Sequence, residues 1–326
     1  MQVNHLASLL KESKPKFFRY WKLISFFIPF IVILEIGRRN SMALEGLWNV
    51  LHIHESRWII WVVLLMPVNW GLEAYKWYYL MQHFGFRLTY LHSYKTTLTG
   101  LAYSLVLPGG IGEYMGRAEA IPVGEGWKGA GVLSIARIAQ LYATVLFGGL
   151  TLGLFLWHKQ YLWLLTGLFL FVSVCWFFFL YSTRLAIWLT QKLGDSYSFL
   201  TDLLYPWTQH GMEKPIVFAV SAVRYLVFTL QFYFILIILG VKESTIDLLS
   251  GISSAFMLKS FFPSFLDLGP RELAVTLFFQ DMNTSIVQVL AASLLLWFIN
   301  VMVPGLAGSL LTLRNVWLNH KYRNVS

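Results

Sequence analysis

Six apolar runs, each long enough to cross a membrane as a helix, constrain this chain more than any other feature. A membrane span needs about 20 consecutive apolar residues. The runs cover residues 20–37, 57–81, 128–157, 161–181, 216–240 and 286–313. Charged residues make up only 13% of the chain against 57% hydrophobic ones, which leaves too little polar surface for a soluble globule. We therefore expect an all-α polytopic membrane helix bundle in which the first run is an uncleaved span.

Two further apolar stretches, 96–122 and 246–281, are interrupted in their middles. Pro108-Gly-Gly-Ile-Gly112 breaks the first, and the segment from Pro263 to Pro270 breaks the second. Each half is too short to cross a bilayer alone, and irregular backbone at membrane depth must be buried in protein or line a wet cavity. The stretches therefore predict two re-entrant helical hairpins. Two pairs of short or interfacial helices are the alternative.

The two halves of the chain share a pattern of glycines and prolines that indicates an internal repeat. The pairs separated by 155 or 157 positions are Gly85 with Gly240, Pro108 with Pro263, Gly112 with Gly269, and Gly148 with Gly305. Three crossings separate equivalent points, so the two copies would be inserted in opposite directions, as in many secondary transporters. We accordingly divide the chain into a cytoplasmic segment with the first span and an outer loop (1–56), a first repeat (57–157), a linking span with a cytoplasmic segment (158–215), a second repeat (216–313) and a cytoplasmic tail (314–326).

Lys and Arg at or beyond the ends of the apolar runs predict the orientation of the chain. With the N-terminus inside, fourteen of them, including Lys128 and Lys192, fall on the inner side, and five, including Lys242, on the outer side. Cytoplasmic loops retain positive charge. The sequence therefore predicts a multi-pass protein of the inner (plasma) membrane with both termini cytoplasmic. The net charge of +9 then reflects topology and anionic lipid, so we expect no nucleic-acid partner.

Charged residues within the apolar segments are the candidates for function, because each is costly at the bilayer centre unless it is paired or wet. Ten of them lie away from the ends of these segments: Glu73, Lys76, Glu113, Arg117, Arg137, Arg224, Lys259, Asp267, Arg271 and Glu272. Each break would place a helix N-terminus in the membrane, where free amides and arginines suit a phosphate or carboxylate. Glu73, Glu113 and Glu272 would hold a cationic head group or carry a proton. The alternative is that these charges only neutralise one another within the bundle.

Motifs of soluble enzymes are missing from this sequence. It has no Ser/His/Asp or Cys/His set, no zinc-type spacing, and no phosphate loop, since Gly109-Gly-Ile-Gly lacks the following Lys and Ser or Thr. We therefore expect no catalytic residues, no metal and no cofactor.

The two interrupted stretches carry a resemblance to a known family. Leu107-Pro-Gly-Gly-Ile-Gly-Glu-Tyr-Met-Gly-Arg117 and Pro263-Ser-Phe-Leu-Asp-Leu-Gly-Pro-Arg-Glu272 resemble the motifs of the lysylphosphatidylglycerol synthase transmembrane region, the flippase-like half of the bacterial multiple peptide resistance factor. The similarity covers about 57–313. It implies paired re-entrant hairpins that translocate lipids such as aminoacylated phosphatidylglycerol. By this resemblance Gly112, Glu113, Arg117, Gly269 and Glu272 would line the lipid path, with Arg137 in the following span.

The chain also departs from that family. Phe265-Leu-Asp stands where many relatives carry Gly-Gly, and we expect no soluble synthase domain after residue 313. Our leading hypothesis is a flippase whose partner is a membrane lipid: an anionic or aminoacylated phospholipid, or an isoprenoid-linked lipid. An intramembrane enzyme using Glu113, Glu272 or Asp267 as acid and base is one alternative. A non-transporting partner of a lipid synthase is another, and a homodimer is left open.

Overall fold

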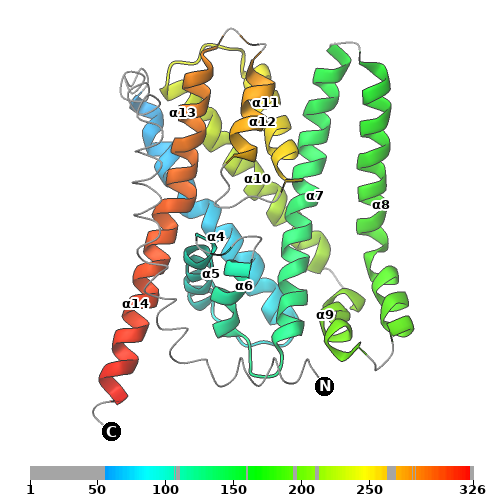
Figure 1. Ribbon diagram of the computed structural model, residues 1–326, viewed down its shortest axis with the longest axis vertical. Coiled ribbons are helices and arrows are strands. Elements are labelled where there is room, and N and C mark those ends of the chain that lie inside the picture. The colour runs from blue at the N-terminus through cyan, green and yellow to red at the C-terminus, as the bar shows by residue number, and fades with distance from the viewer. Residues whose placement is uncertain are drawn as a thin grey trace.

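The protein is an elongated bundle of helices in a computed structural model (Figure 1). The structure describes residues 56–105, 107, 111–158, 161–193, 197–209, 213–262, 269–280, 282 and 284–323, of which 119, 155, 158 and 314–323 are described by their backbone only. These residues form helices and no strand. The all-α class is therefore confirmed, whereas the predicted span at 20–37 and most of the two breaks, 108–110 and 263–268, lie outside the described residues.

The first half contains two long helices with a pair of short ones between them. Its elements are η1 (Ser56–Trp58), α4 (Ile59–His83), α5 (Tyr90–Ser104), α6 (Ile111–Arg117), η2 (Ala118–Ala120) and α7 (Gly126–His158). Helices α5 and α6 pack closely, because a Cβ on Gly116 would lie only 2.1 Å from the backbone nitrogen of Gly100. The expected interruption at 96–122 is thus a helical hairpin, although its first helix begins at Tyr90.

The second half has the same order of elements. It consists of α10 (Glu213–Ile238), α11 (Thr245–Lys259), α12 (Pro270–Phe279) and a final helix made of α13 (Ile286–Trp297), the π-helical turn η4 (Phe298–Met302) and α14 (Val303–Arg323). The α11–α12 hairpin lies in the upper half of the bundle and α5–α6 in the lower half (Figure 1). The core around α10, α11, α12 and α13 is rich in aliphatic and aromatic residues, including Phe232, Phe256 and Phe279.

Equivalent local structures recur 155 positions apart. Helices α5 and α11 both have 15 residues and begin at Tyr90 and Thr245. The preceding helices both end at a glycine with positive φ, +82° at Gly85 and +78° at Gly240. At each end an amide hydrogen-bonds five residues back, Phe86 to Met81 at 2.9 Å and Val241 to Leu236 at 3.1 Å, as in a Schellman cap.

The last helix of each half packs against the hairpin of the other half. Helix α14 crosses α5, where a Cβ on Gly308 would lie 2.0 Å from the carbonyl oxygen of Leu98. Helix α7 crosses α11, where a Cβ on Gly148 would lie 2.4 Å from the Cβ of Met257. Glycine is needed at both crossings because any side chain would force the helices apart.

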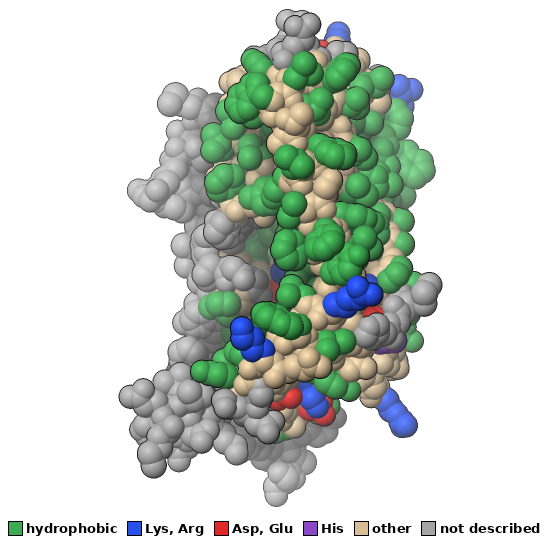
Figure 2. Space-filling model, turned by 90° about the vertical axis from the view of Figure 1, so that its right-hand side faces the viewer, with side chains coloured by type: hydrophobic (Ala, Val, Ile, Leu, Met, Phe, Trp, Pro, Cys, Tyr) green, Lys and Arg blue, Asp and Glu red, His purple; other side chains and the backbone are tan. Residues whose placement is uncertain are grey.

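The linking segment stands at the edge of the bundle. Helix α8 (Leu162–Leu193) runs beside α7, and the short helix α9 (Ser198–Thr208) packs on both at the lower end (Figure 1). Only 6% of the most apolar stretch of α8 is buried. Figure 2 views the side on which α8 lies: hydrophobic side chains cover its upper and middle parts, and Lys and Arg gather mainly lower down. Such a surface is solvated by lipid.

Four helices are long and apolar enough to cross a membrane: Gly126–Leu154, Leu162–Leu193, Glu213–Ile238 and Ile286–Leu313. They coincide with four of the six predicted crossings. Helix α4 matches the predicted span at 57–81 in position and has 25 residues, but Asn69, Glu73 and Lys76 make its second half polar. The chain is thus a multi-pass membrane protein.

Candidate functional site

A cavity of about 510 Å³ lies between the two halves. Helices α4, α5, α7, α10 and α11 all contribute to its wall, together with Leu107, the start of α6 and the turn η4. The wall combines charged and amide side chains with large apolar ones. Its polar and charged members are Asn69, Glu73, Lys76, Ser104, Glu113, Arg137, Gln140, Thr144, Arg224, Lys259, Ser260 and Asn300.

Both hairpins meet this cavity at the same structural position. The first contributes Ser104 at the end of α5 and Leu107 beyond it, and the second contributes Lys259, Ser260 and Phe262 at the end of α11. Ser104 and Lys259 are themselves 155 positions apart, so equivalent ends of the two hairpins border one space.

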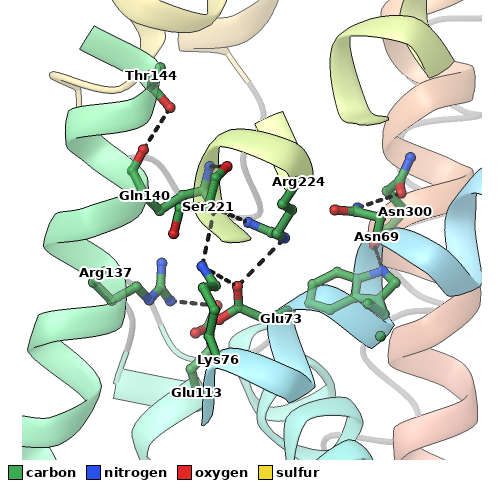
Figure 3. A network of polar contacts seen from close by, with 12 residues as sticks. Asn69, Glu73, Lys76, Glu113, Arg137, Gln140, Thr144, Ser221, Arg224 and Asn300 are labelled. Carbon is green, nitrogen blue, oxygen red and sulfur yellow. Dashed lines mark hydrogen bonds and ion pairs between the residues drawn. The ribbon is translucent and has the colours of Figure 1, made fainter. Parts of the chain in front are cut away.

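Glu73 is the centre of a buried ion-pair cluster (Figure 3). One carboxylate oxygen lies 2.9 Å from Nη2 of Arg117, and the other lies 2.9 Å from Nζ of Lys76 and 3.5 Å from Nε of Arg224. These cations come from α6, α4 and α10 respectively. A single carboxylate therefore ties the first hairpin to one helix from each half.

Gln140 on α7 joins the same cluster through its amide. Its carbonyl oxygen accepts hydrogen bonds of 3.1 Å from both Lys76 and Arg224, and its amide nitrogen donates 3.3 Å to the carbonyl oxygen of Ser221. Arg137, one turn earlier on α7, forms an ion pair with Glu113 on α6. Arg137 is nearly half exposed, with 47% of its side-chain surface accessible, so its guanidinium can reach a molecule in the cavity.

Helical spacing explains why these polar side chains share one wall. Residues three, four or seven apart on a helix lie on the same face. Asn69, Glu73 and Lys76 follow this spacing on α4. Arg137, Gln140 and Thr144 follow it on α7 and line the same cavity.

Arg117 and Gly112, both predicted to line the lipid path, lie behind the cavity instead. The Arg117 side chain is fully buried beneath Glu73, with its guanidinium 5.5 Å from the centroid of the Trp77 ring. Gly112 packs on α5, where a Cβ would come within 2.3 Å of the backbone nitrogen of Ser104. These two residues therefore position the wall of the cavity.

The predicted residues at the start of α12, Arg271 and Glu272, form a separate cluster. Arg271 donates 2.5 Å to Glu272 and 2.7 Å to the hydroxyl of Ser293 on α13. The other carboxylate oxygen of Glu272 accepts 2.7 Å from the amide of Gly269, whose φ is +92°. Glu272 thus caps its own helix, so an amide that we expected to bind a ligand is already occupied. Asp267 lies outside the described residues.

Six of the predicted candidates border the cavity, namely Glu73, Lys76, Glu113, Arg137, Arg224 and Lys259. Several other residues of the wall were not predicted from the sequence. Gln140 was missed because a neutral amide does not stand out as charges do. Trp70 was missed too: its ring lies 5.5 Å from the guanidinium carbon of Arg224, and its indole nitrogen donates 2.9 Å to the carbonyl of Asn300. The spacing of polar residues within each helix was the available signal.

Arginine and lysine outnumber carboxylates in this cluster. Lys76, Arg117, Arg137 and Arg224 face Glu73 and Glu113. The described part of the chain contains no group of three His, Cys, Asp or Glu side chains that could hold a metal ion. Chemically, the arrangement is suited to holding an anionic group beside apolar surface.

Comparison with known proteins gives one result. Residues 24–308 match the family described as the lysylphosphatidylglycerol synthase TM region. No curated protein and no solved structure matches the chain. The match covers most of the sequence, including both hairpins and every described residue of the cavity wall. The chain therefore belongs to the family of lysylphosphatidylglycerol synthase transmembrane regions.

Proposed function

We propose that this protein is a lipid flippase, which moves a lipid head group across the bilayer through the cavity between the two hairpins. The observation that carries the proposal is a charged cavity of about 510 Å³ whose wall includes α7, α10 and the turn η4 of the final helix, all parts of helices that are apolar enough to span a membrane. Charged groups in a membrane bundle are costly, and they typically mark the path of a substrate.

The arrangement of the wall supports transport. Equivalent ends of two hairpins, marked by Ser104 and Lys259, border the cavity from the two halves. We propose that these hairpins are re-entrant and belong to inverted repeats, so that each would gate the cavity from one side of the membrane.

The size of the cavity favours a head group over a whole lipid. A volume of about 510 Å³ falls within the range of small-molecule sites, roughly 300–1,000 Å³. Moving the acyl chains from the bilayer into the protein would release no free energy, because the bilayer is as apolar as they are. Leu141 and Phe262 line the cavity and are also exposed, and we propose that the acyl chains pass along this edge.

Reconstitution of the purified protein would test the proposal. Vesicles containing a lipid labelled on its head group would be treated with a membrane-impermeant reductant, which destroys label in the outer leaflet only. A flippase makes more than half of the label accessible over time, and Arg137→Gln should slow this. If vesicles with protein behave like protein-free vesicles for anionic, zwitterionic and aminoacylated lipids alike, the proposal is wrong.

An intramembrane enzyme acting on lipid head groups is the main rival, with Glu113 as acid or base. Lipid mass spectrometry of cells with and without the protein separates the two. A lipid species that disappears with the protein indicates synthesis. An unchanged lipid inventory with an altered distribution between leaflets indicates transport.

A further inference from the structure

We propose that the cavity selects lipids whose head group is an anionic phosphate ester without an amine, and that Arg137 and Arg224 hold that phosphate. This inference rests on the proposed function and names the substrate class of the same site. It excludes aminoacylated phosphatidylglycerol, the lipid that the name of the family suggests.

The first argument is the charge of the cluster. Among the residues of this cluster that the structure describes, Lys76, Arg117, Arg137 and Arg224 carry four positive charges, against two negative charges on Glu73 and Glu113. The surplus of two does not depend on Lys259, which also borders the cavity. In surroundings of low dielectric constant this surplus favours an anion and repels an ammonium group.

The second argument is the state of the two carboxylates. Glu73 is buried, and Lys76 and Arg117 each approach it to 2.9 Å. Glu113 forms an ion pair with Arg137 and has Nη2 of Arg117 at 3.7 Å. The second oxygen of Glu113 accepts no hydrogen bond but is buried, so an incoming ammonium group would still have to displace a neighbouring cation to reach a carboxylate.

The third argument is the small number of hydrogen bonds that the Arg224 guanidinium makes. Its only hydrogen bond among the described residues is the one to the neutral amide of Gln140, and the carboxylate of Glu73 lies 3.5 Å from its Nε. A guanidinium has five donors in a planar fork that matches a phosphate. Both Arg224 and Arg137 line the cavity, from α10 and α7. Together they present donors to the same space from two helices (Figure 3).

Equilibrium binding to the purified full-length protein in detergent tests the selectivity without requiring transport. Radiolabelled phosphatidylglycerol, lysyl-phosphatidylglycerol and phosphatidylcholine with identical acyl chains would be compared. We expect phosphatidylglycerol to bind about tenfold more tightly than either of the others, the scale of one charge-assisted hydrogen bond. Equal or tighter binding of lysyl-phosphatidylglycerol would overturn the inference.

Two additional ligands identify the source of the phosphate. Soluble glycerophosphoglycerol should compete weakly, because it lacks the acyl chains; if it competes as well as the lipid, the site binds free phosphate esters and the inference is wrong. An isoprenyl phosphate carries the same anionic ester on another apolar tail. We expect it to compete with phosphatidylglycerol, and failure to compete would contradict recognition through the phosphate.

Substitutions that remove a positive charge and substitutions that remove a negative charge should change lipid binding in opposite directions. Arg224→Gln and Arg137→Gln should each weaken phosphatidylglycerol binding about tenfold, because each removes a charged donor. Glu113→Gln should strengthen it, because Arg137 loses its carboxylate partner. The control is Arg184→Gln, the same change at an exposed position on α8. Weaker binding of phosphatidylglycerol to Glu113→Gln would reject the assignment of the phosphate to Arg137 and Arg224. Because the Arg137 side chain is nearly half exposed, Arg137→Gln should fold normally.

The outcomes separate this inference from the proposed function. Selective binding of anionic lipid without any movement between leaflets would reject the flippase and leave the site intact. Movement between leaflets that favours lysyl-phosphatidylglycerol would support the flippase and reject the anionic selectivity.

Discussion

The carboxylate of Glu73 on α4 lies 2.9 Å from the guanidinium of Arg117 on α6, and both side chains are almost completely buried. The two residues are 44 positions apart, and their pairing fixes the first hairpin against a helix that precedes it. Because Lys76 and Arg224 approach the same carboxylate, removing its charge would leave three cations without their shared partner.

Glu73→Gln should therefore destabilise the protein strongly. Breaking a buried ion pair by removing one partner costs about 3–5 kcal/mol. The measurement is the midpoint of thermal unfolding in detergent. Glu125→Gln is the matched control, because Glu125 and Lys128 form an exposed pair at 3.5 Å, which contributes about 1 kcal/mol or less. Equal effects of the two substitutions would show that Glu73 does not hold the hairpin.

Gly116→Ala should separate α5 from α6. The added Cβ would lie 2.1 Å from the nitrogen and 2.2 Å from the Cα of Gly100, and backbone atoms cannot move away without displacing a helix. Overpacking of this kind costs about 1–3 kcal/mol. Gly167→Ala on α8 is the control, because nothing lies within 4 Å of its added Cβ. The prediction fails if both variants unfold at the same temperature as the parent protein.

Gln140→Glu should weaken binding of anionic lipid while leaving the fold intact. The substitution preserves the shape of the side chain and adds a negative charge beside Lys76 and Arg224, which both donate to Gln140 at 3.1 Å. We expect binding of phosphatidylglycerol to fall about tenfold, since the added charge competes with the phosphate for both donors. Gln280→Glu, at an exposed position after α12, should have no effect. Unchanged binding in Gln140→Glu would place the phosphate elsewhere.

The orientation predicted from Lys and Arg can be tested with single cysteines. Helix α8 ends at the lower end of the bundle, and α10 ends at the upper end (Figure 1). After Cys175, the only cysteine, is replaced by Ser, we expect a membrane-impermeant maleimide to label Lys242→Cys in intact cells. Lys192→Cys should react only after the membrane is opened. The reverse pattern would invert the predicted topology.

The positions of helices and breaks were predictable because they depend on local chemistry. Long apolar runs marked the four helices that are able to span a membrane. Gly85 and Gly240 end their helices through a positive φ that glycine adopts without steric cost, so the same signal appears in both halves. The spacing of these glycines anticipated that the two halves would have the same order of elements.

The pairing of the charges was not predictable because it depends on the packing of distant segments. Glu73 was assigned to a binding site, but nothing in its surroundings in the sequence identified Arg117 or Arg224 as its partners. Arg271 and Glu272 looked equivalent to the charges of the first hairpin, yet Ser293 on α13 and the amide of Gly269 engage them locally. Sequence alone supplied the right residue types without showing which of them share a space.

The crossed contacts of α14 with α5 and of α7 with α11 have a mechanical consequence. At Gly308 and Gly148 the crossing helices touch almost backbone to backbone, so there is no slack to absorb a shift. Tilting either hairpin must therefore push a long helix that belongs to the opposite half. The two hairpins cannot tilt independently, because a displacement of either one would be transmitted to the opposite half through these contacts.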